Sequence, residues 1–108
     1  MKKKPTYHGD LIMRLKNKRY ALGYLNVAYQ DSDKRVFLLA LRNVAEAWGG
    51  MTALSRRAKI PRVSLYRMLS KQGNPEIQSI GNALKALGFR FTVVPDRPLH
   101  MPRLKHAA

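Results

Sequence analysis

The stretch TALSRRAKIPRVSLYRML, residues 52–69, decides the fold that the sequence predicts. Its apolar residues recur with the period of about 3.6 residues that is typical of a helix, stop at residues 59–61, and then resume. Two short helices joined by a tight turn are therefore predicted. Thr52 is the expected N-cap of the first helix, and Pro61 suits the entry to the second. The apolar positions are Leu54, Ala58, Ile60, Leu65, Met68 and Leu69.

The second predicted helix turns a polar and basic face away from Leu65 and Leu69, which are expected to face the core. The spacing of the two helices is that of a DNA-binding helix-turn-helix, whose second helix enters the major groove. Arginine can form a fork to the O6 and N7 atoms of guanine, and valine can touch a thymine methyl group. Serine and tyrosine can reach phosphates or base edges. The outward residues are Arg62, Val63, Ser64, Tyr66 and Arg67.

Charge in and around this motif has one sign, because no acidic residue lies between Glu46 and Glu76. A solvated helical surface usually mixes both signs at spacings of three or four residues. A surface that faces phosphates explains the asymmetry better than the alternative, a plain helical hairpin with a solvated basic face. The candidate DNA-binding residues are Thr52, Arg56, Arg57, Arg62, Val63, Ser64, Tyr66, Arg67 and Lys71.

Composition favours one small domain that binds an anion. The chain has 108 residues, of which 45% are hydrophobic, and a formal net charge of +15. This charge favours nucleic acid as the partner, ahead of an acidic protein or a membrane surface. No apolar run approaches the length of a membrane-spanning helix, and the N-terminus lacks the apolar segment of a signal peptide. Without cysteine there is no disulfide framework. We expect a cytoplasmic protein associated with the nucleoid.

Three elements are predicted before the motif, after a flexible basic arm at residues 1–9. Asp10 is the expected N-cap of a short helix, and a second helix covers residues 18–29. Residues 33–48 have the strongest helical periodicity and form the expected central core helix, which Gly49-Gly50 ends. Tyrosines in the second helix could form either a protein-binding surface or the edge of the core. The core-facing positions are Ala21, Leu25, Ala28, Phe37, Leu41, Val44 and Trp48, and the tyrosines are Tyr20, Tyr24 and Tyr29.

Beyond the motif, Asn74-Pro75-Glu76 is a predicted helix start, with a cap, a first-position proline and an acid in the first turn. Gly88 is the expected end of this last helix. Residues 89–94 are rich in β-formers and predict one strand, which needs a partner in a second subunit or another protein. Residues 95–108 are expected to be a flexible tail. The core-facing positions of the last helix are Ile77, Ile80, Leu84 and Leu87.

Groups for catalysis or metal binding are sparse in this sequence. The histidines His8, His100 and His106 all fall in the predicted arms, with no spaced acid or cysteine beside them. The six acidic residues are scattered and are explained as caps or helix-end charges, and no glycine-rich phosphate loop is present. We therefore expect no enzyme activity, no cofactor and no metal.

The sequence resembles the family of probable addiction-module antidote proteins, which are HigA-like helix-turn-helix antitoxins. The resemblance covers about residues 11–94, and its specificity comes from the order and spacing of short pieces. These pieces are Tyr24-Leu25-Asn26 with Ala28, Phe37-Leu38 with Ala40-Leu41 and Val44-Ala45, Gly49-Gly50-Met51-Thr52, Ser64-Leu65-Tyr66-Arg67 with Leu69-Ser70, Gly73-Asn74-Pro75-Glu76, and Leu84-Lys85-Ala86-Leu87-Gly88.

The resemblance implies a homodimeric antitoxin that neutralises a small ribonuclease-type toxin of the RelE/HigB class. It also implies repression of the shared operon through binding to a palindrome in double-stranded DNA. The expected fold is all-α: a lambda-repressor-like helix-turn-helix domain over residues 10–94, with five to six helices and a short C-terminal β-strand. The recognition-helix positions carry over as Arg62, Ser64, Tyr66 and Arg67, with Thr52 near the DNA backbone.

The sequence departs from the family pattern in its turn and in its charge. Lys59 stands where glycine is common, and a lysine at positive φ costs on the order of 1 kcal/mol. Pro61 replaces the usual serine cap. RelE-type toxins are generally basic, so the toxin-binding surface of this basic chain should be locally neutral or acidic. Residues 20–33 and residues 89–94 are the two candidates for that surface.

Two other functions are compatible with the sequence. One is a stand-alone helix-turn-helix repressor of the phage type, with the same fold and no toxin partner. The other is a basic RNA-binding or nuclease-like protein, which the charge alone would permit. Stacking aromatics on a sheet and acid–base pairs are missing, and both absences count against this last function.

Overall fold

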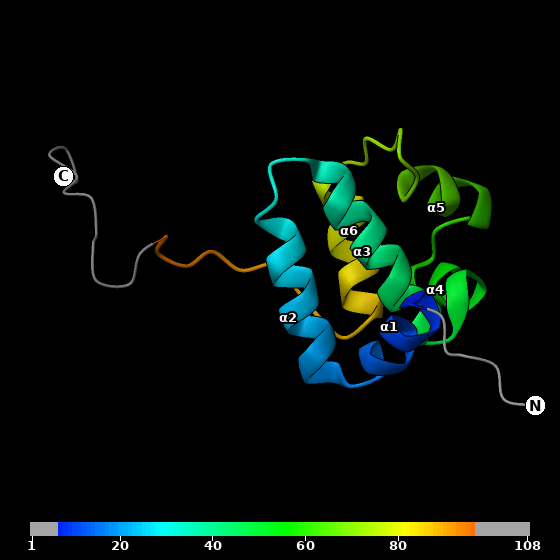
Figure 1. Ribbon diagram of the computed structural model, residues 1–108. Helices are drawn as coiled ribbons and strands as arrows, with labels where there is room; N and C mark the ends of the chain where they lie inside the picture. Colours follow the sequence, from blue (N-terminus) through cyan, green and yellow to red (C-terminus); the bar gives the residue numbers. More distant parts are fainter. Residues whose placement is uncertain (1–6, 97–108) are drawn as a thin grey trace, which may run out of the picture.

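Six α-helices make up most of residues 7–96, the part of the chain that this computed structural model describes (Figure 1). The predicted all-α class is confirmed for this part, and the prediction of five to six helices with it. The second helix has the predicted bounds, and the third begins and ends within one residue of its predicted ends. The helices are α1 (Tyr7–Leu15), α2 (Lys18–Tyr29), α3 (Lys34–Ala47), α4 (Gly50–Ala58), α5 (Arg62–Met68) and α6 (Ile77–Ala86).

Helix α3 is the centre of the core, as its periodicity predicts. It packs against α1, α2 and α4, while α4 also packs against α5 and α6. Leu41 and Val44 of α3 have no exposed surface. Trp48 at the end of α3 is half-buried against the core, and its indole Nε1–H donates a hydrogen bond of 2.7 Å to the carbonyl oxygen of Leu15. Its predicted role as a core anchor is confirmed.

The predicted starts of α1 and α4 are wrong. Helix α1 begins at Tyr7, so Asp10 lies in its first turn, where the carboxylate pairs with Arg14 at 3.4 Å instead of capping the helix. Residues 7–9 are therefore helical, and the remainder of the predicted arm lies outside the described residues. Helix α4 begins at Gly50 with Gly49 as its N-cap at φ +110°, so Thr52 lies inside the first turn. The glycines reverse the chain before Thr52 can act as a cap.

The turn between α4 and α5 has the left-handed residue that the sequence pattern implied. Lys59 has φ +58°, and it is the one non-glycine residue with positive φ among those described. Ser55 pairs both backbone polar groups of Ile60 in this turn. Its carbonyl oxygen accepts a hydrogen bond from the amide of Ile60 at 3.1 Å, and its hydroxyl donates one to the carbonyl of Ile60 at 2.6 Å. Pro61 stands at the entry of α5, as predicted, at the N-cap position.

Helix α6 begins later than predicted. Glu76 is its N-cap. The side chain of Asn74 does not cap α6; its amide oxygen accepts a 2.8 Å hydrogen bond from Lys34 Nζ and so links the loop to α3. Ile77 is 77% exposed, so its prediction as a core residue is wrong. The predicted end at Gly88 is confirmed, with φ +87°. The other predicted core positions, Ile80, Leu84 and Leu87, are buried.

The predicted strand at residues 89–94 is wrong for the described part of the chain, which contains no strand. The segment leaves α6 and runs away from the helices near α2 (Figure 1). Phe91 lies near Tyr29 and Phe37, with both ring centroids at 6.4 Å. A strand needs backbone partners from a second strand, and residues 7–96 supply none. Most of the predicted tail lies outside the described residues.

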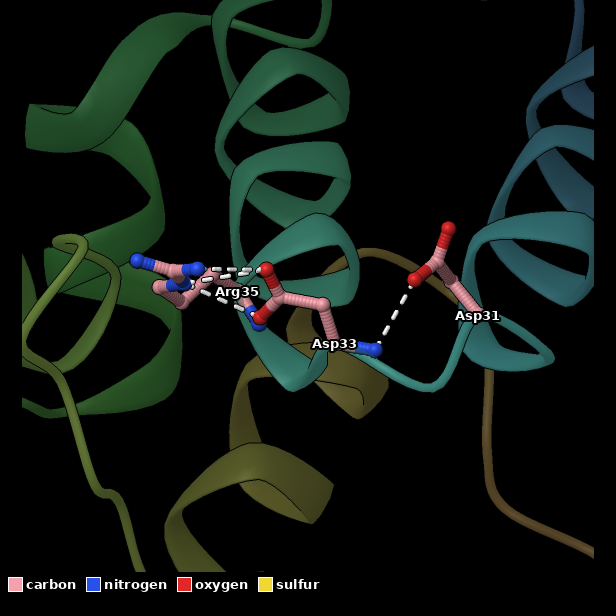
Figure 2. A network of polar contacts seen from close by, with 3 residues as sticks. All are labelled: Asp31, Asp33 and Arg35. Atoms are coloured by element: carbon pink, nitrogen blue, oxygen red, sulfur yellow. Dashed lines mark hydrogen bonds and ion pairs between the residues drawn. The ribbon is translucent and has the colours of Figure 1, made fainter.

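The N-terminus of α3 is fixed by a small polar network (Figure 2). The carboxylate of Asp33 accepts the backbone amide of Arg35 at 3.0 Å and the guanidinium of the same residue at 2.7 Å. Asp31 accepts the backbone amide of Asp33 at 2.8 Å. Side-chain hydrogen bonding from Arg35, followed by the backbone bond, lowers the pKa of Asp33 to about 2. Asp33 is therefore an ionised N-cap at neutral pH.

Replacement of Lys59 by glycine should stabilise the protein. The left-handed conformation of a residue with a Cβ costs about 1–2 kcal/mol, and the greater freedom of glycine in the unfolded chain offsets part of this. We expect Lys59→Gly to raise the free energy of unfolding in urea by about 0.5–1 kcal/mol. Lys59→Ala removes the same charge and retains the Cβ, so it should bring no such gain. Equal gains in both variants would mean that relief of charge repulsion is responsible.

The Asp33 network should give stability a pH dependence of defined sign. The folded pKa of about 2 lies below the unfolded value, so the stabilisation is present above about pH 4. It is lost as the pH falls toward 2. Asparagine can still cap the helix, so Asp33→Asn isolates the charge. The difference in urea midpoint between wild type and Asp33→Asn should be constant from pH 7 to 5 and shrink below pH 4. A difference that persists unchanged at pH 2 would contradict this assignment.

Candidate nucleic-acid interface

The two faces of α5 are separated as the sequence predicts. Leu65 within the helix and Leu69 just after it are buried, with 0% and 2% exposure. The opposite face is open to solvent, and Val63 is 71% exposed on it. Each of the nine candidate residues is exposed, so none of them is needed to build the core. They are Thr52, Arg56 and Arg57 on α4, Arg62, Val63, Ser64, Tyr66 and Arg67 on α5, and Lys71 beyond it.

Carboxylates do not neutralise this surface within the described residues. The ion pairs of residues 7–96 join Asp10 to Arg14, Asp33 to Arg35, and Glu46 to His8. None of them includes a cation of the α4–α5 pair. In a chain of net charge +15, such a cluster of unpaired cations favours the approach of an anion.

An arginine of α3, Arg42, joins this surface although the sequence pattern does not predict it. The guanidinium carbon of Arg42 lies 5.2 Å from the ring centroid of Tyr66, and that of Arg62 lies 5.9 Å from the same ring. Arg42 lies within the predicted core helix, and its neighbours in the sequence do not show which residues of other helices it contacts. Its approach to α5 depends on how α3 and the α4–α5 pair are placed in space.

A groove lies between α3 and the segment that follows α5. Cationic side chains of α3 and of the loop after α5 line it together with apolar side chains. Ser70 lies between them, and its hydroxyl donates a hydrogen bond of 2.8 Å to the carbonyl of Arg67. The lining residues are Asp33, Arg35, Val36, Leu39, Arg42, Leu69, Ser70 and Lys71. Arg42, which lines this groove and also approaches Tyr66, thus connects the groove with the cationic face of α5.

A second surface of different character lies at the other end of the molecule, where the C-terminal segment leaves α6 near α2 (Figure 1). It is apolar and aromatic, with Tyr29 64% exposed, Phe91 39% and Val93 97%. Tyr24 does not belong to it: this residue is half-buried, and its hydroxyl accepts a 3.0 Å hydrogen bond from the buried Asn43. The sequence predicts that the tyrosines form either a protein-binding surface or the edge of the core. Tyr24 lies at the edge of the core, whereas Tyr29 lies on an exposed surface.

The described residues contain neither a candidate metal site nor a candidate membrane span. Among residues 7–96, no three His, Asp or Glu side chains are grouped so that they could hold a metal ion. Within the same residues, no helix is both long and apolar enough to cross a bilayer. His8 hydrogen bonds to Glu46 at 3.1 Å. His100 and His106 lie outside the described residues.

Comparison with known proteins identifies the family. The profile of a family described as probable addiction module antidote protein matches residues 6–95. This chain belongs to that antidote family. An uncharacterized protein of Haemophilus influenzae (strain ATCC 51907 / DSM 11121 / KW20 / Rd) is 36% identical to it over 74 residues, which cover 68% of this chain and 75% of that protein. No solved structure matches the chain.

Membership in the antidote family confirms the resemblance stated from the sequence. It supports an antitoxin role in general and implies a cognate toxin as partner. Antidote proteins of this kind are generally not enzymes. The matched region includes all six helices, so both the basic surface of α4–α5 and the apolar surface near α2 belong to the part of the chain that resembles the family.

Proposed function

We propose that this antidote is a DNA-binding antitoxin that neutralises a small toxin of the RelE/HigB class and represses its own operon. In this proposal the α4–α5 pair is a helix-turn-helix within a lambda-repressor-like fold, and the protein works on the nucleoid in the cytoplasm. The observation that carries the proposal is the exposed cationic face of α5, whose arginines have no carboxylate partner among the described residues.

The side chains of α5 suit the major groove of B-DNA. Arg62 and Arg67 can form bidentate hydrogen bonds to guanine, and Val63 can contact a thymine methyl group. Ser64 can reach a phosphate or a base edge. The cations of α4 and the loop, namely Arg56, Arg57 and Lys71, together with Thr52, are assigned to the DNA backbone, where contacts set register and orientation. A homodimer would place two such helices about 34–36 Å apart on a palindromic operator.

Substitution of the arginines of α5 should weaken specific DNA binding. We expect Arg62→Ala or Arg67→Ala to lose about 1–3 kcal/mol of affinity for the DNA upstream of the gene. Fluorescence anisotropy at fixed salt concentration measures this loss. Arg19→Ala is the matched control, since it removes an exposed arginine of α2 outside the proposed interface. Equal affinity of the wild type for the upstream DNA and for a scrambled duplex would count against specific recognition.

The toxin-binding surface is proposed at the apolar end of the molecule. Two candidate segments for it are distant in sequence, but Tyr29 of one and Phe91 of the other have ring centroids 6.4 Å apart. They form one surface whose formal charges balance, because Asp33 is paired with Arg35 and the exposed Asp31 and Arg90 have opposite signs. A neutral aromatic surface can accept a basic toxin without direct repulsion, and aromatic residues are enriched at protein interfaces. This surface lies away from α5 (Figure 1).

Co-expression with the small protein encoded next to this one tests the antitoxin role. We expect that protein to arrest growth, and we expect this chain to restore growth and to co-purify with it. Phe91→Ala should weaken the protection, because it removes the ring that lies beside Tyr29 and Phe37, while duplex binding should remain. Arg67→Ala should have the opposite effect. If the neighbour is not toxic and forms no complex, a stand-alone repressor of the phage type is the better description.

A further inference from the structure

Arg42 is a cation of α3 that lies against the proposed DNA-reading helix. Its side chain is half-buried, and its guanidinium carbon is 5.2 Å from the ring centroid of Tyr66. The guanidinium of Arg62 approaches the same ring at 5.9 Å. Two cations on one ring are held by its π electrons but repel each other, so an anion at their open side would relieve the repulsion.

Protein carboxylates do not supply that anion within the described residues. Glu46 lies one helical turn after Arg42, where an i,i+4 ion pair would be the ordinary expectation. The structure instead joins Glu46 to His8 at 3.1 Å. Asp33, which lines the same groove as Arg42, pairs with Arg35 at 2.7 Å. Arg42 is therefore not neutralised by either acid of its own helix region.

The groove next to Arg42 has the chemistry of a DNA backbone site. Arg42 and Lys71 contribute charge from two different elements, and the hydroxyl of Ser70 lies in the same lining. Val36 and Leu39 add apolar surface, with 38% and 56% exposure. The groove therefore offers two cations and a hydroxyl to a phosphate, and aliphatic side chains to the adjoining sugar.

We propose that Arg42 and Lys71 bind one backbone phosphate of the duplex that α5 reads, and that the ring of Tyr66 holds the guanidinium of Arg42 in place. This inference rests on the proposed DNA-binding function and deepens it. It adds α3 to the interface and makes Tyr66 a positioning residue, not a reader of bases. The contact strengthens binding to any sequence, because phosphates carry no base identity.

The salt dependence of binding tests the phosphate contact. Loss of one contact should reduce the slope of log affinity against log salt by about 0.9. At 0.1 M salt this corresponds to a loss on the order of tenfold for Arg42→Gln, equal for the upstream duplex and a scrambled duplex. Arg42→Lys retains the charge and should retain most of the slope. Arg19→Ala, which also removes one exposed arginine, should leave the slope unchanged.

The role of Tyr66 is tested by a double-mutant cycle. If the ring acts through Arg42, Tyr66→Leu should weaken binding to both duplexes. The double variant Tyr66→Leu/Arg42→Gln should then lose much less affinity than the product of the fold-losses of the two single variants. Circular dichroism and urea unfolding establish that each variant is folded. If Tyr66→Leu does not fold, Tyr66→Phe takes its place: it retains the ring and should bind both duplexes as the wild type does, and a loss of binding would contradict the role of the ring.

The outcomes separate this inference from the proposed function. If the wild type binds duplex DNA and Arg42→Gln shows the wild-type slope, Arg42 makes no phosphate contact and the inference is overturned while DNA binding stands. A sequence-dependent loss in Arg42→Gln would also overturn it, since it would indicate contact with a base. If the wild type shows no salt-dependent binding to either duplex, both the proposed function and the phosphate site are wrong.

Discussion

The structure depends on the burial of one face of α3. Leu41 and Val44 are fully excluded from solvent, and α1, α2 and α4 all pack around this helix. Burial of such side chains is the main favourable term in the folding of a small domain. Trp48 extends the packing to the end of α1 through its hydrogen bond to Leu15. Glycines then turn the chain directly into α4, so the position of the basic helices follows from the position of α3.

Unbalanced positive charge is the second constraint on this molecule. The acids that pair with cations in the described part of the chain lie on α1, on α3 and at the N-cap of α3, outside the α4–α5 pair. Net charge of one sign destabilises a compact state through self-repulsion. The cationic face is thus costly for folding, and an anionic partner would offset the cost. The family membership and the proposed DNA interface are consistent with such a partner.

The two proposed binding surfaces differ in chemistry and lie at different ends of the fold (Figure 1). One is cationic and is built on the exposed side of two short helices. The other is neutral and aromatic, and it combines the end of α2 with the segment after α6. The proposed DNA-binding surface and the proposed toxin-binding surface therefore do not share residues.

The sequence by itself determined the helical elements, the buried stripe of α3, the two faces of α5 and the family. Each follows from local periodicity or from short motifs. Tertiary structure decided the rest. The start of α6 depended on a contact with another helix, because the side chain of Asn74 bonds to Lys34 of α3. Residues 89–94 formed no strand because backbone pairing needs a second strand. Arg42 reaches Tyr66 because two helices are juxtaposed, and periodicity within one helix carries no information about its neighbours.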